Sequence, residues 1–176
     1  MIVVLWHTVK EISQKIYNQV FKNLNRQKIQ CSECKQFGFK IHAYYDHHFK
    51  IAGQSKKKNI VITQLICPHC GKTHAVLLCT MVPWSQITLE DTIRIIEAKS
   101  SEEMCQLMYE NENITEEDVN RIRRVFRREW KERLKGFNIN IDDDLSENCI
   151  KWHKRQFMQN HCGVCIAITQ RHIGSP

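Results

Sequence analysis

Two pairs of cysteines constrain the fold more than any other feature of the sequence. Cys31 and Cys34 form one C-x-x-C motif, and Cys67 and Cys70 form a second, with 32 residues between the motifs. Two such turns facing each other place four thiolates around one ion, which is the tetrahedral set that structural Zn²⁺ prefers. Gly71 follows the second pair directly and suits a tight turn. We therefore predict one structural zinc ion, bound by all four cysteines.

The segment between the pairs has the pattern of a long hairpin. Residues 59–66 are rich in β-branched side chains, residues 51–59 read as a polar turn, and residues 74–79 read as a third strand. Apolar side chains also alternate with polar ones before the turn, at the period of a half-buried strand. These alternating positions are Phe37, Phe39, Ile41, Ala43 and Tyr45. The pattern predicts a zinc ribbon over residues 31–83.

The cysteine count and the absence of targeting signals indicate the compartment. The chain has nine cysteines, and its apolar start, "IVVLW", is too short to cross a bilayer and does not read as a signal peptide. Cytosolic thiols stay reduced, so we expect metal ligands rather than disulfides, and a cytoplasmic, nucleoid-associated protein without membrane contact. Cys79 and Cys105 stand alone in apolar surroundings, and we expect both to be buried.

A third cysteine pair, Cys162 and Cys165, leaves two interpretations open. It could bind a second metal ion with nearby residues, or its thiols could be reduced and structural. The candidate co-ligands are His161, His172, Cys149 and His153. We favour structural thiols, because no further C-x-x-C motif matches the pair and residues 165–169 read as a buried strand end.

The rest of the chain is predicted to be helical. Residues 1–30 carry an amphipathic helix at 8–25, and residues 137–176 form a C-terminal helix at 145–159 with a tail. Between them, residues 84–136 contain three helix starts, at Thr88, Ser100 and Thr115, each with an acidic residue three positions later. The order resembles a helix-turn-helix. The predicted fold is therefore α+β, with a four-cysteine zinc ribbon and a helical, helix-turn-helix-like part.

Positive charge is concentrated in the third of these helices, predicted over residues 116–135. The chain has a net charge of +7, and residues 121–135 hold eight Lys/Arg and two Glu. Helical geometry places Val119, Ile122, Phe126, Trp130 and Leu134 on one face. A basic stripe on the opposite face comprises Arg121, Arg124, Arg128, Lys131 and Lys135. The stripe either contacts nucleic acid or is a solvated surface, and we favour nucleic acid.

The predicted hairpin tip adds a second basic group, Lys56, Lys57 and Lys58. A basic hairpin end could reach a nucleic-acid backbone, or it could be only a charged turn. Both interpretations stay open.

Residues 31–96 resemble a transposase-like zinc-ribbon domain family of unknown function from bacterial (Firmicutes) mobile elements. The resemblance is carried by "CSEC", by "HAYYDHHF" and above all by "ICPHCGKTHAVLLCTMVPWSQI", where Trp84 stands at a position that is usually Tyr. It implies DNA binding connected with an insertion or integrative element, and a transposase or recombinase as a possible protein partner.

Two functions are compatible with these features. The first is a zinc-dependent protein that binds double-stranded DNA, as a regulator or transposition accessory factor. The second is a zinc-ribbon adaptor, or RNA binder, that docks an acidic partner through the basic helix. We expect no enzyme activity, since a four-cysteine zinc site has no open position for substrate. Three consecutive acids, Asp142 to Asp144, do not by themselves form a two-metal site.

Overall fold

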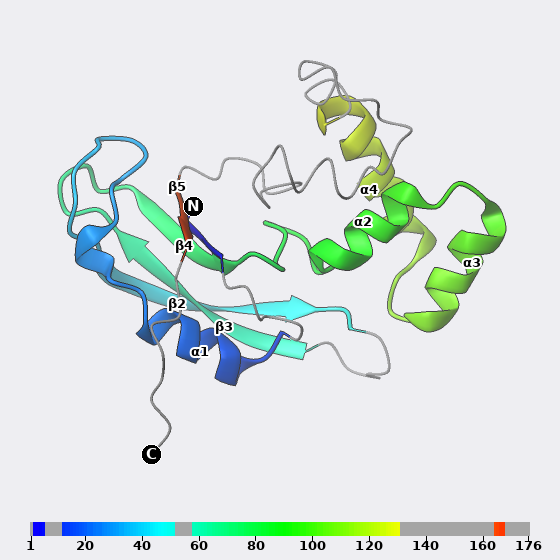
Figure 1. Cartoon of the computed structure of the whole chain (residues 1–176), viewed down its shortest axis with the longest axis horizontal. Helices are drawn as coiled ribbons and strands as arrows, with labels where there is room; N and C mark the ends of the chain where they lie inside the picture. The colour runs from blue at the N-terminus through cyan, green and yellow to red at the C-terminus, as the bar shows by residue number, and fades with distance from the viewer. Residues whose placement is uncertain (1, 6–11, 52–57, 131–163, 168–176) are drawn as a thin grey trace. The chain divides into compact units, whose positions relative to one another are not determined.

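A computed structural model of the chain describes residues 2–5, 12–51, 58–130 and 164–167 (Figure 1). These residues form two compact units. The described part of unit 1 comprises residues 2–5, 12–47, 60–79 and 164–167, and that of unit 2 comprises residues 48–51, 58–59 and 80–130.

Unit 1 is built on a five-stranded sheet of order β2-β3-β4-β1-β5. The strands are β1 (Ile2–Leu5), β2 (Lys40–Phe49), β3 (Lys58–Ile66), β4 (Thr73–Leu78) and β5 (Val164–Ala167). β3 and β4 pair antiparallel with Gln64 opposite Ala75, whereas β1 runs parallel to both β4 and β5. β2 and β3 run in opposite directions (Figure 1). The last residues of β2 and the first residues of β3 belong to unit 2.

The first strand explains the apolar start of the chain. Ile2, Val3 and Val4 are completely buried, and they lie opposite Val76, Leu77 and Leu78 of β4. A strand with parallel neighbours on both sides is covered on both faces, so its sequence is a continuous apolar run rather than an alternating one. The run that was too short for a membrane is therefore a central strand of the sheet.

Helix α1 (Gln14–Lys22) fills a gap between two strands of the sheet. It begins after Ser13, whose side chain accepts the N–H of Ile16. The Tyr17 hydroxyl accepts the N–H of Thr63 in β3 at 2.8 Å and donates to the carbonyl of Val76 in β4 at 3.0 Å. The Gln14 amide also bonds the backbone N–H and C=O of Val61. Side chains of α1 thus replace ladder hydrogen bonds where β3 and β4 separate.

Unit 2 contains three helices, α2 (Leu89–Glu97), α3 (Ser101–Glu110) and α4 (Glu116–Val125), and α4 is extended by the π-helical residues Phe126–Trp130. Each helix begins as predicted: the side chains of Thr88, Ser100 and Thr115 accept backbone N–H groups of the first turn. The helices share one apolar core. It consists of Val82, Ile87, Leu89, Ile93, Ile95, Leu107, Ile114, Val119, Ile122 and Phe126.

A buried polar network joins residues 48–51 to these helices within unit 2. The Lys50 Nζ lies 2.5 Å from an Asp118 carboxylate oxygen in α4, and both side chains are largely buried. The fully buried Asn111 donates to the Lys50 carbonyl and to the Asp91 carboxylate. Within unit 2, residues 48–51 are therefore anchored to the helices by an ion pair and hydrogen bonds.

The α+β class and the four-cysteine cluster are confirmed, but the fold differs from the predicted segments in several respects. Residues 2–5 are a strand within the expected helical segment 1–30, and α1 begins at Gln14 instead of at residue 8. The ribbon strands are part of a larger sheet, and one boundary between the two units lies between Cys79 and Thr80. Cys79 is buried as expected, whereas Cys105 is exposed, because α3 turns it away from the core.

Two further predictions lie outside the described residues: the helix at 145–159 and the end of the helix predicted over residues 116–135. In the described part of the chain, no helix is long and apolar enough to cross a membrane.

Candidate functional site

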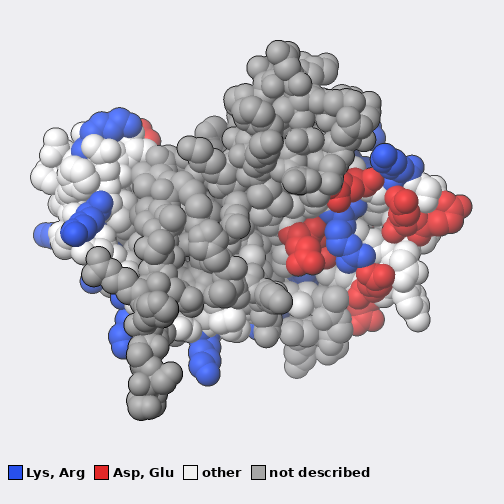
Figure 2. Space-filling model, in the orientation of Figure 1, with Lys and Arg blue, Asp and Glu red and all other residues white. Residues whose placement is uncertain are grey.

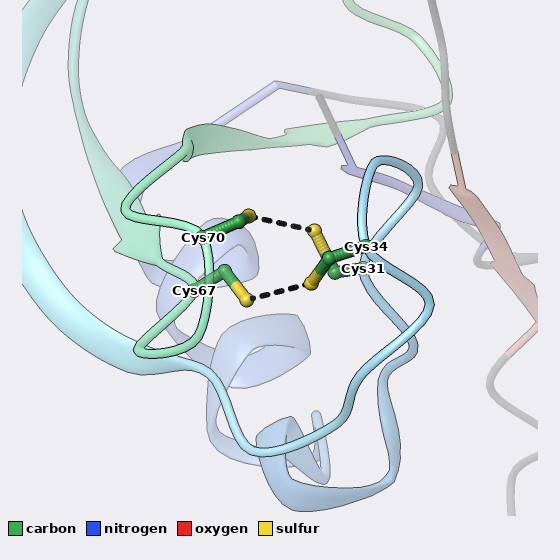
Figure 3. Close-up of side chains that lie close together, drawn as sticks. All are labelled: Cys31, Cys34, Cys67 and Cys70. Carbon is green, nitrogen blue, oxygen red and sulfur yellow. Dashed lines mark hydrogen bonds between the residues drawn. The ribbon is translucent and has the colours of Figure 1, made fainter.

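The four predicted cysteines come together at one end of unit 1. The sulfur of Cys31 lies 3.7 Å from that of Cys70, and the sulfur of Cys34 lies 3.5 Å from that of Cys67 (Figure 3). All four sulfur atoms lie within 4.8 Å of one another. Tetrahedral zinc–sulfur bonds of about 2.3 Å place sulfurs about 3.8 Å apart. The arrangement therefore fits one tetrahedral ion with no ligand left over, and it is the only such cluster found among the described residues.

The two cysteine turns have the same backbone hydrogen bonds, which explains why the sulfurs face each other. In the first turn, Cys31 N–H donates to the Gln36 carbonyl and Lys35 N–H to the Cys31 carbonyl. In the second turn, the Cys67 N–H donates to the Lys72 carbonyl and the Gly71 N–H donates to the Cys67 carbonyl. Both turns need a left-handed residue after the second cysteine, and the φ angles are 63° at Lys35 and 69° at Gly71. Glycine adopts that conformation without a steric penalty, whereas lysine does not.

The electrostatics of the cluster favour a bound cation. Burial alone would raise the pKa of Cys67, but hydrogen bonds from the N–H groups of Cys70 and His69 and from the thiols of Cys34 and Cys70 lower it to about 6. At Cys34 the N–H of Gln36 lowers the pKa, but desolvation and the neighbouring cysteine sulfurs together raise it to about 12. The Cys67 thiolate therefore forms readily, whereas a second thiolate in the cluster is disfavoured by repulsion from the first negative charge. A divalent cation removes this conflict, so metal binding would release protons.

His74 is a neighbour of the four-cysteine cluster. Its side chain is buried, its ring meets the Phe39 ring edge-on at 5.1 Å, and its Nε2 lies 3.7 Å from the sulfur of Cys31. Burial lowers the pKa of His74. β4 turns His74 inward, beside the cluster. His69 is exposed.

The predicted basic helix exists over its described part, and its two faces are as expected. Val119, Ile122 and Phe126 are buried, and Arg121, Arg124 and Arg128 are exposed. Arg127 is exposed as well, although it was not assigned to the stripe. Together with Asn120 and Arg123, three of these arginines line an open hollow of about 590 Å³; they are Arg124, Arg127 and Arg128.

Acidic residues surround the beginning of the same helix. Residues 80–120 hold ten Asp/Glu and only two Lys/Arg, whereas residues 121–128 hold five Arg and no acid. Figure 2 shows acidic side chains gathered over the helical unit. The first turn of α4 contains Glu116, Glu117 and Asp118, and an Asp118 oxygen lies 3.5 Å from the Arg121 guanidinium. Arg121 is therefore partly neutralised, whereas Arg124 and Arg127 lie beyond the acidic turn.

Arg123 has a structural role that sequence analysis did not identify. Its guanidinium donates to the backbone carbonyls of Ile95 and Ala98 at the end of α2. A cation that closes the carbonyl end of a helix stabilises the helix dipole. The one sign of this role in the sequence is the position of Arg123 on the helix, between the apolar face and the basic face.

Several predicted site residues are outside the described chain. They are Lys56, Lys57, Lys131, Lys135, Cys149, His153, His161, Cys162 and His172. Of the predicted tip lysines, Lys58 is described: it is the partly buried first residue of β3. Cys165 lies in β5 opposite Val3, which agrees with the predicted strand at this position.

No family model, curated protein or solved structure matches the chain. The residues and their geometry therefore carry the functional argument.

Proposed function

We propose that this chain is a zinc-dependent DNA-binding protein that contacts the DNA backbone through the exposed arginines of α4 and its π-helical extension. A structural zinc ion at the four cysteines would hold the two turns of unit 1 together. The observation that carries the proposal is the separation of charge in unit 2, where five arginines within eight residues follow a strongly acidic segment. A polyanion is repelled by most of this unit and attracted to one helix face.

Within the helix, the contact is shifted away from the first turn. A recognition helix of the helix-turn-helix type normally meets bases with its first residues. In α4 the first three residues are acids, and the Arg121 guanidinium is paired with the carboxylate of the third, Asp118. We therefore assign the phosphate contacts to Arg124, Arg127 and Arg128 and give Arg121 a smaller part than its position in the sequence indicates. The helix-turn-helix order of α2, α3 and α4 belongs to this proposal, as does the predicted continuation of the stripe through Lys131 and Lys135.

The biological setting is part of the same proposal. The resemblance of residues 31–96 to a domain family of mobile elements supports a regulator or accessory factor that works with a transposase or recombinase. Nucleoid association would follow from DNA binding itself. An RNA-binding or adaptor role is the alternative, and it would use the same arginines.

The test replaces Arg124, Arg127 and Arg128 by Ala and measures binding to mixed-sequence duplex DNA over a series of salt concentrations. Each lost phosphate contact should reduce the slope of log affinity against log salt by about 0.9, so the triple variant should lose about 2.7. The matched control changes three exposed cations of unit 1, Lys15, Lys22 and Lys28, and removes the same charge. Arg121→Ala alone should change the slope less than Arg124→Ala alone.

Zinc content is measured on the same preparations by elemental analysis, and the expected value is one ion per chain. A triple variant that binds duplex DNA as the control does would refute the DNA proposal. Equal or tighter binding to RNA, lost in the triple variant, would favour the alternative role.

A further inference from the structure

Strand β2 is the edge of the sheet among the described strands, and it is unusually open on both faces. The order β2-β3-β4-β1-β5 gives it one strand neighbour, β3. Along its ten residues only Phe49, the last, is buried, and seven are exposed. The exposed side chains include Ile41 at 38%, Tyr44 at 61% and Tyr45 at 38%. Large apolar side chains on both faces of one edge strand indicate a surface that another molecule covers.

The strand also lacks the usual protection of a sheet edge. Natural edge strands avoid pairing with other chains by being short, or by carrying proline, bulges or many charges. β2 has ten residues, where about five or six are typical. It contains no proline or glycine, and its only Lys, Arg, Asp or Glu residues are Lys40 and Asp46. A strand of this kind is suited to main-chain pairing with a second strand.

The sequence of β2 is complementary to itself in one antiparallel register. When two copies of a strand pair antiparallel about a two-fold axis, a residue lies opposite the residue that is equally far from the axis on the other side. The numbers of two opposed residues therefore always add up to twice the number of the central residue. Centring the axis on Ala43 places Lys40 opposite Asp46 of the second copy, and no other centre opposes these two charges. The same register places Ile41 opposite Tyr45 and His42 opposite Tyr44. Opposite charges and apolar or aromatic pairs in direct cross-strand positions each stabilise a sheet.

We propose that β2 pairs antiparallel with β2 of a second copy of this chain, with the two-fold axis at Ala43. The two sheets would then continue across the interface, and each copy would present the same surface, as closed two-fold dimers do. On one sheet face Ile41 and Tyr45 of the two copies cover each other. On the other face the Lys40–Asp46 pairs flank the two tyrosines at position 44. All residues in this register belong to unit 1, so the pairing is independent of unit 2 and of nucleic acid.

The test uses charge reversal in the zinc-loaded full chain, with the dimer dissociation constant measured by sedimentation equilibrium. Lys40→Asp places acid opposite acid, and Asp46→Lys places lysine opposite lysine. Because each change makes two cross-strand pairs repulsive, each variant alone should dimerise at least about tenfold more weakly than the parent. An equal mixture of the two variants should recover the parent affinity as a heterodimer, since both pairs are then attractive. Lys28→Asp, which changes an exposed residue outside β2, is the control and should behave as the parent.

Each other outcome overturns a defined part of the proposal. A parent chain that stays monomeric overturns the dimer, and variants that dimerise as the parent does overturn the use of β2. Weak variants whose mixture also stays monomeric overturn the register. If a variant fails to fold, amide exchange on the parent decides: alternate amides of residues 41–45 should exchange more slowly as protein concentration rises, and no change with concentration refutes the pairing.

Discussion

Replacing Tyr17 by Phe removes the one oxygen atom that bridges β3 and β4 where the two strands separate. Their last described pair is Gln64 with Ala75, and from Val76 onward β4 pairs with β1 instead. At this junction the Tyr17 hydroxyl accepts from the Thr63 N–H at 2.8 Å and donates to the Val76 carbonyl at 3.0 Å. The side chain is only 2% exposed, so water does not replace the lost hydroxyl easily.

The expected loss of stability follows from these two groups. A buried backbone donor or acceptor left without a partner costs about 1–3 kcal/mol, and Tyr17→Phe leaves one of each. Phe keeps the ring volume, so no cavity forms, and its lower polarity offsets part of the cost. We expect the free energy of unfolding of unit 1 to fall by about 3 kcal/mol. With an m-value of about 2 kcal/mol/M, the urea midpoint should fall by about 1.5 M.

The measurement is urea unfolding of the zinc-loaded protein, together with amide exchange at Thr63. Tyr44→Phe is the matched control, because the Tyr44 side chain is 61% exposed and should cost less than about 0.5 kcal/mol. Thr63 should exchange much faster in the Tyr17 variant alone. If the two variants unfold at the same urea concentration and protect the Thr63 amide equally, the bridging role of Tyr17 is refuted.

The same hydroxyl predicts how stability depends on alkaline pH. Burial raises the pKa of Tyr17 to about 12, above its ordinary value of 10.0. A group whose pKa is raised by folding stabilises the protein below its unfolded pKa, and the contribution is lost as pH rises through the folded pKa. The parent should therefore lose stability between about pH 10 and pH 12. Tyr17→Phe should reduce this dependence, leaving the part due to Tyr45, whose pKa burial also raises, and Tyr44→Phe should retain it.

Two further predictions concern the buried ion pair and the metal centre. Asp118→Asn leaves Lys50 buried without its ion partner, so unit 2 should lose about 3 kcal/mol in thermal unfolding, against little change for the exposed Glu117→Gln. Burial alone would raise the pKa of Asp118, but bonds from Lys50 and Thr115 lower it, so this stability should be present above about pH 4 and lost as pH falls further. A metal-bound thiolate can only accept a hydrogen bond, so His74 must donate to Cys31; His74→Phe should weaken zinc binding about 10–100-fold in chelator competition. His74→Gln retains an N–H donor and should weaken it less, whereas an effect of His69→Phe equal to that of His74→Phe would contradict this role.

Local chemistry made the helix starts and the four-cysteine cluster predictable. A capping residue acts on the N–H groups of its own first turn, so Thr88, Ser100 and Thr115 marked their helices without any tertiary information. The four cysteines were predictable for a similar reason. Each pair forms its own turn, and only the meeting of the two turns is long-range.

The strands at the two ends of the chain were not fully predictable, because their pairing is entirely long-range. Residues 2–5 lie beside residues 76–78 on one side and residues 164–167 on the other. No turn signal connects β1 to either neighbour, and four apolar residues fit a strand, a helix end or a buried loop equally well. The late strand was expected as a strand end, but its parallel partner could not be identified from the sequence.

Burial along β2 and β4 could not be predicted from their patterns either. The alternation at Phe37, Phe39, Ile41, Ala43 and Tyr45 predicted one covered face. Of these residues only Phe39 is buried, because an alternating pattern shows that one face is apolar without showing what covers it. His74 is the converse case, a polar residue that β4 turns inward beside Cys31. The Cys31 sulfur supplies the polar neighbour that burial requires, and the sequence alone does not place it there.

The acidic first turn of α4 has a structural cause that bears on how the helix can meet DNA. Asp118 completes the capping box with Thr115 and also pairs with Lys50, so the acid at this position serves folding in two ways. A helix that needs this acid in its first turn cannot present that turn to phosphate without repulsion. Arg124 and Arg127 lie beyond this turn, whereas Arg121 pairs with Asp118 and Arg123 caps α2. The first turn of α4 thus stabilises the fold, and the following turns carry the arginines that we propose contact DNA. Loss of Asp118 should therefore lower stability, whereas loss of Arg124 or Arg127 should lower affinity for DNA and leave stability nearly unchanged.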